Sequence, residues 1–142
     1  MKARALLAAL VACALACAAL DSRSTPVGVE KTHWTLASLG AGRAAIPETQ
    51  SEAFIVIGAE PGRVSGSGGC NRLAAGYELD GRSLEFGAIA GTRMACEHGM
   101  EVEAALSSTL ESTASFRVVG EQLELYDAAG VLLATFEADP GE

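Results

Sequence analysis

Apolar runs separated by glycine-containing turns predict short strands along most of the chain. Residues 32–39 (THWTLASL) alternate between apolar and polar, whereas residues 54–57 (FIVI) form the continuous apolar run of a buried strand. Asp80-Gly81 lies between two strand-like runs and predicts a hairpin over residues 77–86. Further strands are expected at 63–67, 116–119, 122–126 and 131–136.

One segment has a helical period instead. Val102, Leu106 and Leu110 recur every four residues, so residues 100–112 are predicted to form an amphipathic helix that lays this stripe on a sheet. Glu101 and Glu103 lie in its first turn, where the helix dipole favours acidic side chains. Because a parallel sheet needs a crossover after nearly every strand, strands around a single helix predict an α+β domain with mostly antiparallel pairing. We expect a curved sheet, a partial barrel, closed by one packed α-helix.

The start of the chain has the pattern of an export signal. Lys2 and Arg4 precede an apolar run that ends at Leu20. Within this run Cys13 and Cys17 each follow small or aliphatic residues and resemble the cysteine of a bacterial lipobox, which becomes the acylated N-terminus. Cys17 is the favoured lipidation site, because cleavage before it removes Cys13 and leaves no odd thiol near the terminus.

Ordinary signal cleavage is the alternative, because Ala14-Leu15-Ala16 also has the small-x-small pattern of a secreted or soluble periplasmic protein. With Ala18 after Cys17, the lipobox resemblance implies a lipoprotein anchored in the outer membrane and facing the periplasm. The predicted organisation is a signal peptide over 1–16, a tether over 17–31, one domain over 32–136 and a tail over 137–142.

The charge of the chain argues against two classes of partner. The 142 residues have a net charge of −8, and loss of the signal peptide makes it −10, because two basic residues leave and no acidic one does. No run of lysine or arginine is present to bind nucleic acid or to attach to anionic lipid by charge. We expect a monomer without a cofactor, whose partner is an envelope protein or a small hydrophobic ligand.

The stretch SGSGGCN, residues 65–71, suggests a phosphate loop, but its context does not fit one. Lysine and Ser/Thr do not follow the glycines, and Gly66, Gly68 and Gly69 do not give the spacing G-x-G-x-x-G. These glycines are better explained by a strand that bends where another backbone or the helix approaches too closely for a side chain.

Cys70 and Cys96 remain once the signal cysteines are removed, and in an oxidising compartment we expect them to form a disulfide. The main alternative is a copper-handling protein. Met94, Cys96, His98 and Met100 alternate, which on an extended segment would place four soft ligands on one face, as copper(I) favours. A thiol-active pair of Cys96 and His98 is another alternative. Because both require a free thiol at Cys96, we assign no metal site and no catalytic residue.

Several motifs together resemble the META domain, the family that includes the heat-inducible HslJ lipoproteins. They are Trp34-Thr35-Leu36, Gly69-Cys70-Asn71-Arg72 before Tyr77, Thr92-Arg93-Met94-Ala95-Cys96 before the helix, and Leu123-Glu124-Leu125 ahead of Phe136. The resemblance spans about residues 32 to 136. It departs from many relatives at Leu73 and Ala75, where they have an aromatic residue and a glycine.

The resemblance implies a curved antiparallel sheet with one helix on a bacterial envelope, without an established catalytic activity and associated with stress responses and antibiotic tolerance. It implies structural roles for Trp34, Asn71, Thr92 and Arg93. We expect Asn71 to bond backbone at the bend, with Thr92 and Arg93 bracing that corner, although the Arg93 guanidinium also suits a carboxylate or a partner's C-terminus. We predict a non-catalytic envelope lipoprotein with an apolar ligand groove between the helix and the sheet.

Overall fold

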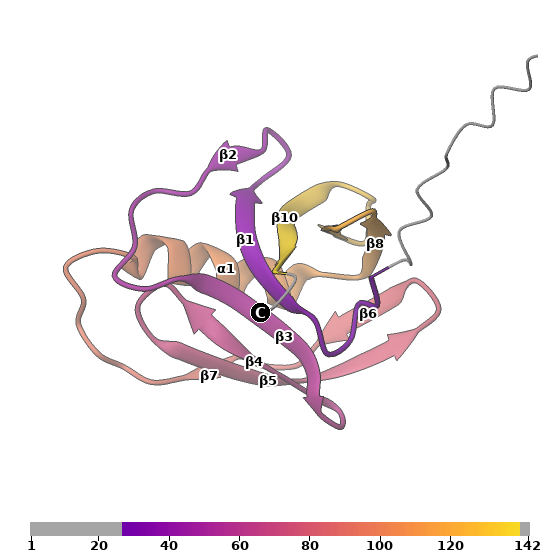
Figure 1. The fold of residues 1–142 in the computed structure, drawn as a ribbon, viewed down its shortest axis with the longest axis horizontal. Helices are drawn as coiled ribbons and strands as arrows, with labels where there is room; N and C mark the ends of the chain where they lie inside the picture. Colours follow the sequence, from indigo (N-terminus) through magenta and orange to yellow (C-terminus); the bar gives the residue numbers. More distant parts are fainter. Residues whose placement is uncertain (1–26, 140–142) are drawn as a thin grey trace, which may run out of the picture.

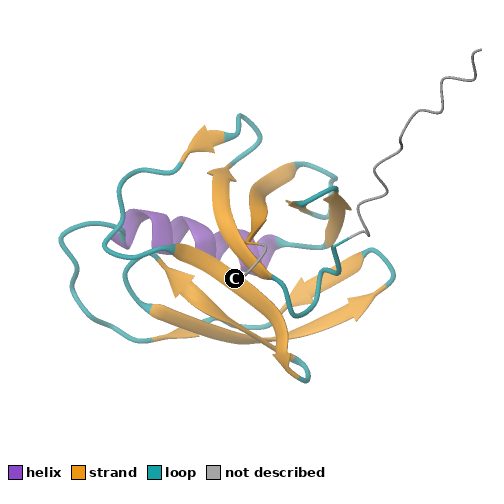
Figure 2. Cartoon of the chain, in the orientation of Figure 1, coloured by secondary structure: helices purple, strands orange, loops and turns teal. Residues whose placement is uncertain are grey.

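The computed structural model describes residues 27–139, which form one curved sheet and a single helix (Figures 1 and 2). The strands are β1 His33–Leu39, β2 Ala44–Ala45, β3 Ala53–Glu60, β4 Arg63–Gly68, β5 Arg72–Asp80, β6 Ser83–Phe86, β7 Ala90–Gly91, β8 Ser115–Val119, β9 Gln122–Tyr126 and β10 Leu132–Asp139, and the helix is α1 Met100–Ser112. These strands pair antiparallel throughout. The predicted α+β class, with a curved antiparallel sheet and one packed helix, is confirmed.

The sheet closes on itself incompletely. The strands follow the order β10-β9-β8-β6-β5-β4-β3-β1-β2, β7 pairs with β5, and β1 also pairs with β10. The join between β6 and β8 consists of one residue pair, Ser83 with Ser115. Helix α1 packs against β4 and β6 near this join. A ring held at one point by a single pair is a partial barrel, as the sequence predicts.

The hydrophobic core fills the inside of the ring. The stripe Val102, Leu106 and Leu110 is at most 3% exposed, and it belongs to one cluster with Trp34 of β1 and Phe136 of β10, which are completely buried. The predicted helix and its bounds are therefore confirmed. The same packing overturns the predicted ligand groove between the helix and the sheet, because the side chains of the stripe fill that space.

The predicted strands are recovered, with differences at their ends. The hairpin at Asp80-Gly81 forms, with Asp80 opposite Ser83 and Gly81 at φ 60°. Strand β5 begins at Arg72, five residues earlier than expected, since glycine and alanine give its first half no apolar alternation. The sequence did not predict β2 and β7, because two residues are too few to show a periodic pattern.

The folded domain extends beyond both predicted boundaries. Ahead of β1, Glu30 forms a bridge with Ile57, and the indole nitrogen of Trp34 donates a hydrogen bond of 2.9 Å to the Val29 carbonyl. At the other end β10 continues to Asp139, which pairs with His33. Residues 27–31 and 137–139, predicted as tether and tail, are therefore part of the domain.

The predicted signal peptide over 1–16, the lipidation site Cys17, its rival Cys13 and the rest of the tether lie outside the described residues. Within residues 27–139, no helix is long and apolar enough to cross a membrane.

Candidate functional site

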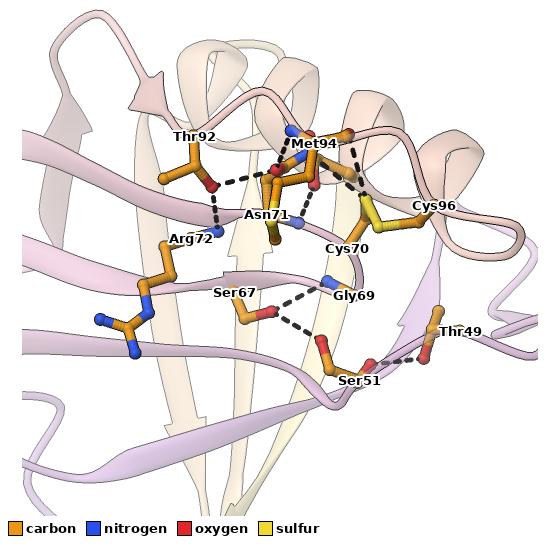
Figure 3. The surroundings of a disulfide bond; sticks show 11 residues. Thr49, Ser51, Ser67, Gly69, Cys70, Asn71, Arg72, Thr92, Met94 and Cys96 are labelled. Carbon is orange, nitrogen blue, oxygen red and sulfur yellow. Dashed lines mark hydrogen bonds between the residues drawn. A yellow bond between two sulfur atoms is a disulfide. The ribbon is translucent and has the colours of Figure 1, made fainter.

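The motif residues gather at one corner of the domain, where the turn between β4 and β5 meets the loop that precedes α1 (Figure 3). Cys70 lies in this turn and Cys96 in the loop, and they form a disulfide with 5.9 Å between their Cα atoms. The bond connects segments 26 residues apart. The structure thus contains the disulfide that the cysteine count indicates, and it fixes the loop against the sheet.

Asn71 is the centre of this corner and is only 3% exposed. Its side-chain oxygen accepts hydrogen bonds from the Met94 amide at 2.7 Å and from the Thr92 hydroxyl at 3.0 Å. Its side-chain nitrogen donates to the Met94 carbonyl at 3.1 Å and to Oε1 of Glu103 at 3.0 Å. One amide therefore holds both backbone groups of Met94 and connects the loop with the helix, which agrees with the structural role expected for Asn71.

Sequence reasoning missed the role of Glu103. Besides the bond from the Asn71 side chain, the Glu103 carboxylate accepts the backbone N–H of Asn71 at 2.5 Å. Gly68 permits this contact, since a Cβ atom there would lie 2.9 Å from the Cα of Glu103. At Gly66 the same construction places a Cβ 2.1 Å from the Phe54 carbonyl oxygen of the neighbouring strand. The glycines mark close approaches of the helix and of a strand, as the sequence predicts.

The two remaining motif residues of the loop behave differently. The Thr92 hydroxyl accepts the Arg72 backbone N–H at 3.1 Å while it donates to Asn71, so it braces the corner as expected. The Arg93 side chain is exposed and makes no hydrogen bond or ion pair with any described residue. The predicted bracing role of Arg93 is therefore wrong, because its exposed side chain makes none of the contacts that hold the corner.

The loop does not form the extended copper-ligand line of the alternative hypothesis. Residues 92–99 have no strand structure, Met100 is the first residue of α1, and Cys96 is bonded to Cys70. Within residues 27–139, no three histidine, cysteine, aspartate or glutamate side chains lie close enough together to hold a metal ion. The copper and thiol hypotheses thus lack the free thiol at Cys96 that both require.

A second polar cluster surrounds Glu124 of β9, whose side chain is 5% exposed. Oε1 lies 2.7 Å from the Arg43 guanidinium, and Oε2 lies 2.9 Å from that of Arg117. Oε2 also accepts the Tyr126 hydroxyl at 2.5 Å. The hydrogen bond from Tyr126 is the largest cause that lowers the pKa of Glu124, and the hydrogen bonds from the two arginines lower it further. The Glu124 carboxylate in turn raises the pKa of Tyr126. These mutual contacts join the β1–β2 turn to strands β8 and β9.

We expect acid to weaken this cluster. A carboxyl group whose pKa is lowered by folding contributes stability above its unfolded pKa and loses that contribution as the pH falls through the folded pKa. Glu124→Gln should therefore lower the free energy of unfolding by about 1 kcal/mol at pH 7 and flatten its decline below about pH 4.5. Urea unfolding at several pH values measures this, and equal pH slopes for the variant and the wild type would contradict it.

A hydroxyl–carboxylate contact connects the segment before β1 to the sheet. The Tyr77 hydroxyl of β5 donates a hydrogen bond to the Glu30 carboxylate, and this bond is the largest cause of a pKa of about 12 for Tyr77. Gly58 leaves room for the pair, since a Cβ there would lie 2.8 Å from the Tyr77 hydroxyl oxygen. The contact adds to the Glu30–Ile57 bridge and the Trp34–Val29 hydrogen bond that hold residues 27–31 to the domain.

Beside the disulfide corner, the outer face of the sheet carries a groove. Val64 and Leu73 point into the core, so the alternation of the strands places Ser65 and Arg72 on the outer face. Two adjoining hollows of about 590 and 430 Å³ share Ser65, Gly66 and Arg72. The first is also lined by Ser51, Glu52, Phe54, Ser67, Cys70 and Met94, and the second by Leu73, Ala74, Ala90, Gly91 and Thr92. We call the two together the β4–β5 groove.

A partial barrel around one helix, with a disulfide-bonded corner, defines a compact α+β domain whose motif residues hold the fold together. The chain belongs to the META domain family, whose profile matches residues 27–140. This match confirms the resemblance seen in the sequence and includes the segment before β1 that the structure adds to the domain. No curated protein matches the chain.

Solved structures share the fold. A protein from Burkholderia xenovorans, determined by NMR, is 27% identical with a TM-score of 0.65, over 80% of this chain and 85% of that one. A second NMR structure is 25% identical with a TM-score of 0.58, over 78% and 94%. A crystal structure of a DUF4847 family protein from Bacteroides vulgatus has a TM-score of 0.55 over 80% and 96%, and its 13% identity supports likeness of fold alone.

Proposed function

We propose that this protein is a non-catalytic lipoprotein of the bacterial envelope, which binds an envelope component and helps to maintain the envelope under stress. The observation that carries the proposal is that side chains of the motif are bonded to other groups within the protein. Cys70 and Cys96 are bonded to each other, and Asn71 and Thr92 make hydrogen bonds within the corner. These four motif side chains therefore stabilise the fold, whereas Arg93 is exposed, and in this proposal the protein binds its partner through its outer surface.

The membrane attachment in this proposal rests on the sequence before residue 27. The apolar signal and the lipobox-like cysteines support export and acylation at Cys17, and Ala18 supports delivery to the outer membrane. An oxidising compartment is consistent with the Cys70–Cys96 disulfide, since disulfides form and persist in oxidising compartments and are rare in the reducing cytosol.

The proposal is tested in the bacterium that encodes the protein. We expect deletion of the gene to reduce survival after heat or antibiotic exposure, and the wild-type gene on a plasmid to restore it. The restored protein should incorporate an alkyne-labelled palmitate and fractionate with the outer membrane. Cys17→Ala should abolish labelling and restoration, because it removes the cysteine to which the lipid is proposed to be attached.

Cys13→Ala is the matched control, since it changes the other signal cysteine and should label and restore like the wild type. Labelling that depends on Cys13 would move the anchor to that residue. A deletion strain that survives as well as its parent would refute the stress role, and an unlabelled wild-type protein would refute the lipoprotein assignment.

A further inference from the structure

The β4–β5 groove contains a cation that no neighbour neutralises. Arg72 lines both hollows, and its guanidinium makes no hydrogen bond or ion pair within residues 27–139. In Figure 3 its side chain extends away from the corner, while its backbone N–H is bonded to Thr92. The nearby acid of the groove, Glu52, has its own partner, the His33 ring nitrogen at 2.7 Å. An anionic group entering the groove therefore meets an available guanidinium.

The groove also offers apolar surface that is held in place. The Phe54 ring stacks on His33, with 4.2 Å between the ring centroids. Met94 is 60% exposed, and Asn71 binds both of its backbone groups, so the main chain that carries the thioether is held while the side chain itself can adjust to a ligand. Apolar walls that are ordered before binding lower the entropic cost of taking up an aliphatic chain.

The backbone of the groove does not suit an added peptide strand. Strands β4 and β5 form its floor, and they pair with each other from Arg63 opposite Gly76 to Ser67 opposite Arg72. Strand β4 is also paired with β3 on its other side. Because peptide recognition by strand addition needs unpaired backbone N–H and C=O groups, recognition here depends on side chains.

The charge of the groove favours a single negative charge. One guanidinium balances one carboxylate in a bidentate pair. A phosphate, with close to two negative charges, would leave part of its charge unpaired, and Glu52, which lines the same hollow, would repel it more strongly than it repels the single charge of a carboxylate. A carboxylate with an aliphatic chain satisfies both the cation and the apolar walls.

We infer that the β4–β5 groove binds a long-chain aliphatic carboxylate, with the carboxylate on Arg72 and the chain along Phe54 and Met94. The volumes of the hollows, about 590 and 430 Å³, lie within the roughly 300–1,000 Å³ of small-ligand sites. This inference rests on the proposed binding function and names the class of ligand.

The test uses the full chain with Cys13→Ala and Cys17→Ala, so that no acyl chain is attached, exported and purified from the periplasm. Dodecanoate is titrated below its micelle concentration, and binding is followed by calorimetry and by the NMR amide shifts of Ser65 and Arg72. We expect saturable binding, weaker binding of octanoate because four methylene groups fewer are buried, and no binding of dodecyltrimethylammonium.

Arg72→Gln should weaken dodecanoate binding about tenfold or more, since it removes the charge-assisted pair but leaves the backbone bonds of residue 72. Arg93→Gln is the matched control: it removes an exposed, unpaired arginine that does not line the groove, and it should bind like the wild type. Ser65→Phe, at an exposed position, should fill the groove and abolish binding without entering the core.

Circular dichroism and thermal unfolding verify that each variant is folded. Absence of saturable dodecanoate binding, equal binding by Arg72→Gln, or equal binding of the cationic amphiphile would overturn the inference. None of these outcomes tests the proposed envelope function, which the deletion and labelling experiments test separately. If the inference fails while those experiments succeed, the envelope component is bound elsewhere on the domain.

Discussion

The double variant Cys70→Ala/Cys96→Ala is expected to lose about 3–4 kcal/mol of its free energy of unfolding. The disulfide closes a loop across 26 residues of separation, and opening it returns the corresponding conformational freedom to the unfolded chain. A domain of this size has roughly 5–15 kcal/mol of stability in total, so the variant should unfold at markedly lower urea concentration. Its midpoint and slope in urea, measured without reductant, give the loss directly.

Two comparisons make this prediction specific to the bond. The full chain with Cys13→Ala and Cys17→Ala, treated with reductant, should show most of the loss seen for the double variant in that same background, because both lack the cross-link, while the variant also lacks the buried Cys70 sulfur that accepts a hydrogen bond from Asn71. The double variant itself should not respond to reductant. A loss under about 1 kcal/mol would contradict the prediction and mean that the hydrogen bonds of the corner hold the loop even in its absence.

Asn71→Ala should destabilise the domain by about 3 kcal/mol with the disulfide intact. The substitution leaves the backbone groups of Met94 and one oxygen of Glu103 without their partner, at an almost buried position, and each unsatisfied buried group costs about 1–3 kcal/mol. Urea unfolding under non-reducing conditions measures the loss. Amide hydrogen exchange at Met94 should accelerate in parallel, because that N–H loses its acceptor.

Thr92→Ala provides the matched control within the same network. It removes a single hydroxyl that donates to Asn71 and accepts from the Arg72 amide, in an exposed residue, and should cost about 1 kcal/mol. If Asn71→Ala costs no more than Thr92→Ala, the amide is not the centre of the corner. Water would then be replacing its bonds.

The two substitutions with the largest effects should not be additive. The disulfide and Asn71 both hold the loop that contains Met94 and Cys96, so the second loss acts on a loop already released by the first. Combining Asn71→Ala with the cysteine double variant should therefore cost less than the sum of the separate losses. A fully additive result would show that the bond and the amide hold different parts of the corner.

Patterns among residues close in sequence were sufficient to predict most of the fold. The helix over 100–112 and the hairpin at Asp80-Gly81 follow from periodicity and turn chemistry, which act between residues close in sequence. The cysteine count indicated the Cys70–Cys96 bond. Strands β2 and β7 were missed because two residues carry no period, and their pairing is decided by the strands beside them.

The side-chain clusters were harder to predict than the strands and the helix, since the residues in each cluster come from distant parts of the chain. Glu103 had a local explanation as an acidic residue in the first helical turn, whereas its contacts with Asn71 depend on how α1 sits against β4. Arg93 and Arg72 look alike in the sequence, and only the backbone conformation of each segment decides which of them lines a groove.

By itself, the sequence determined the class of fold, the one helix, the close approaches at Gly66 and Gly68, the family and the acidic charge of this protein. These properties depend on residue type and short-range spacing. The tertiary structure alone decided that the helix leaves no groove against the sheet, that residues 27–31 belong to the domain, and that the β4–β5 groove lies on the outer face. Those outcomes depend on side chains meeting across long separations, which spacing along the chain does not encode.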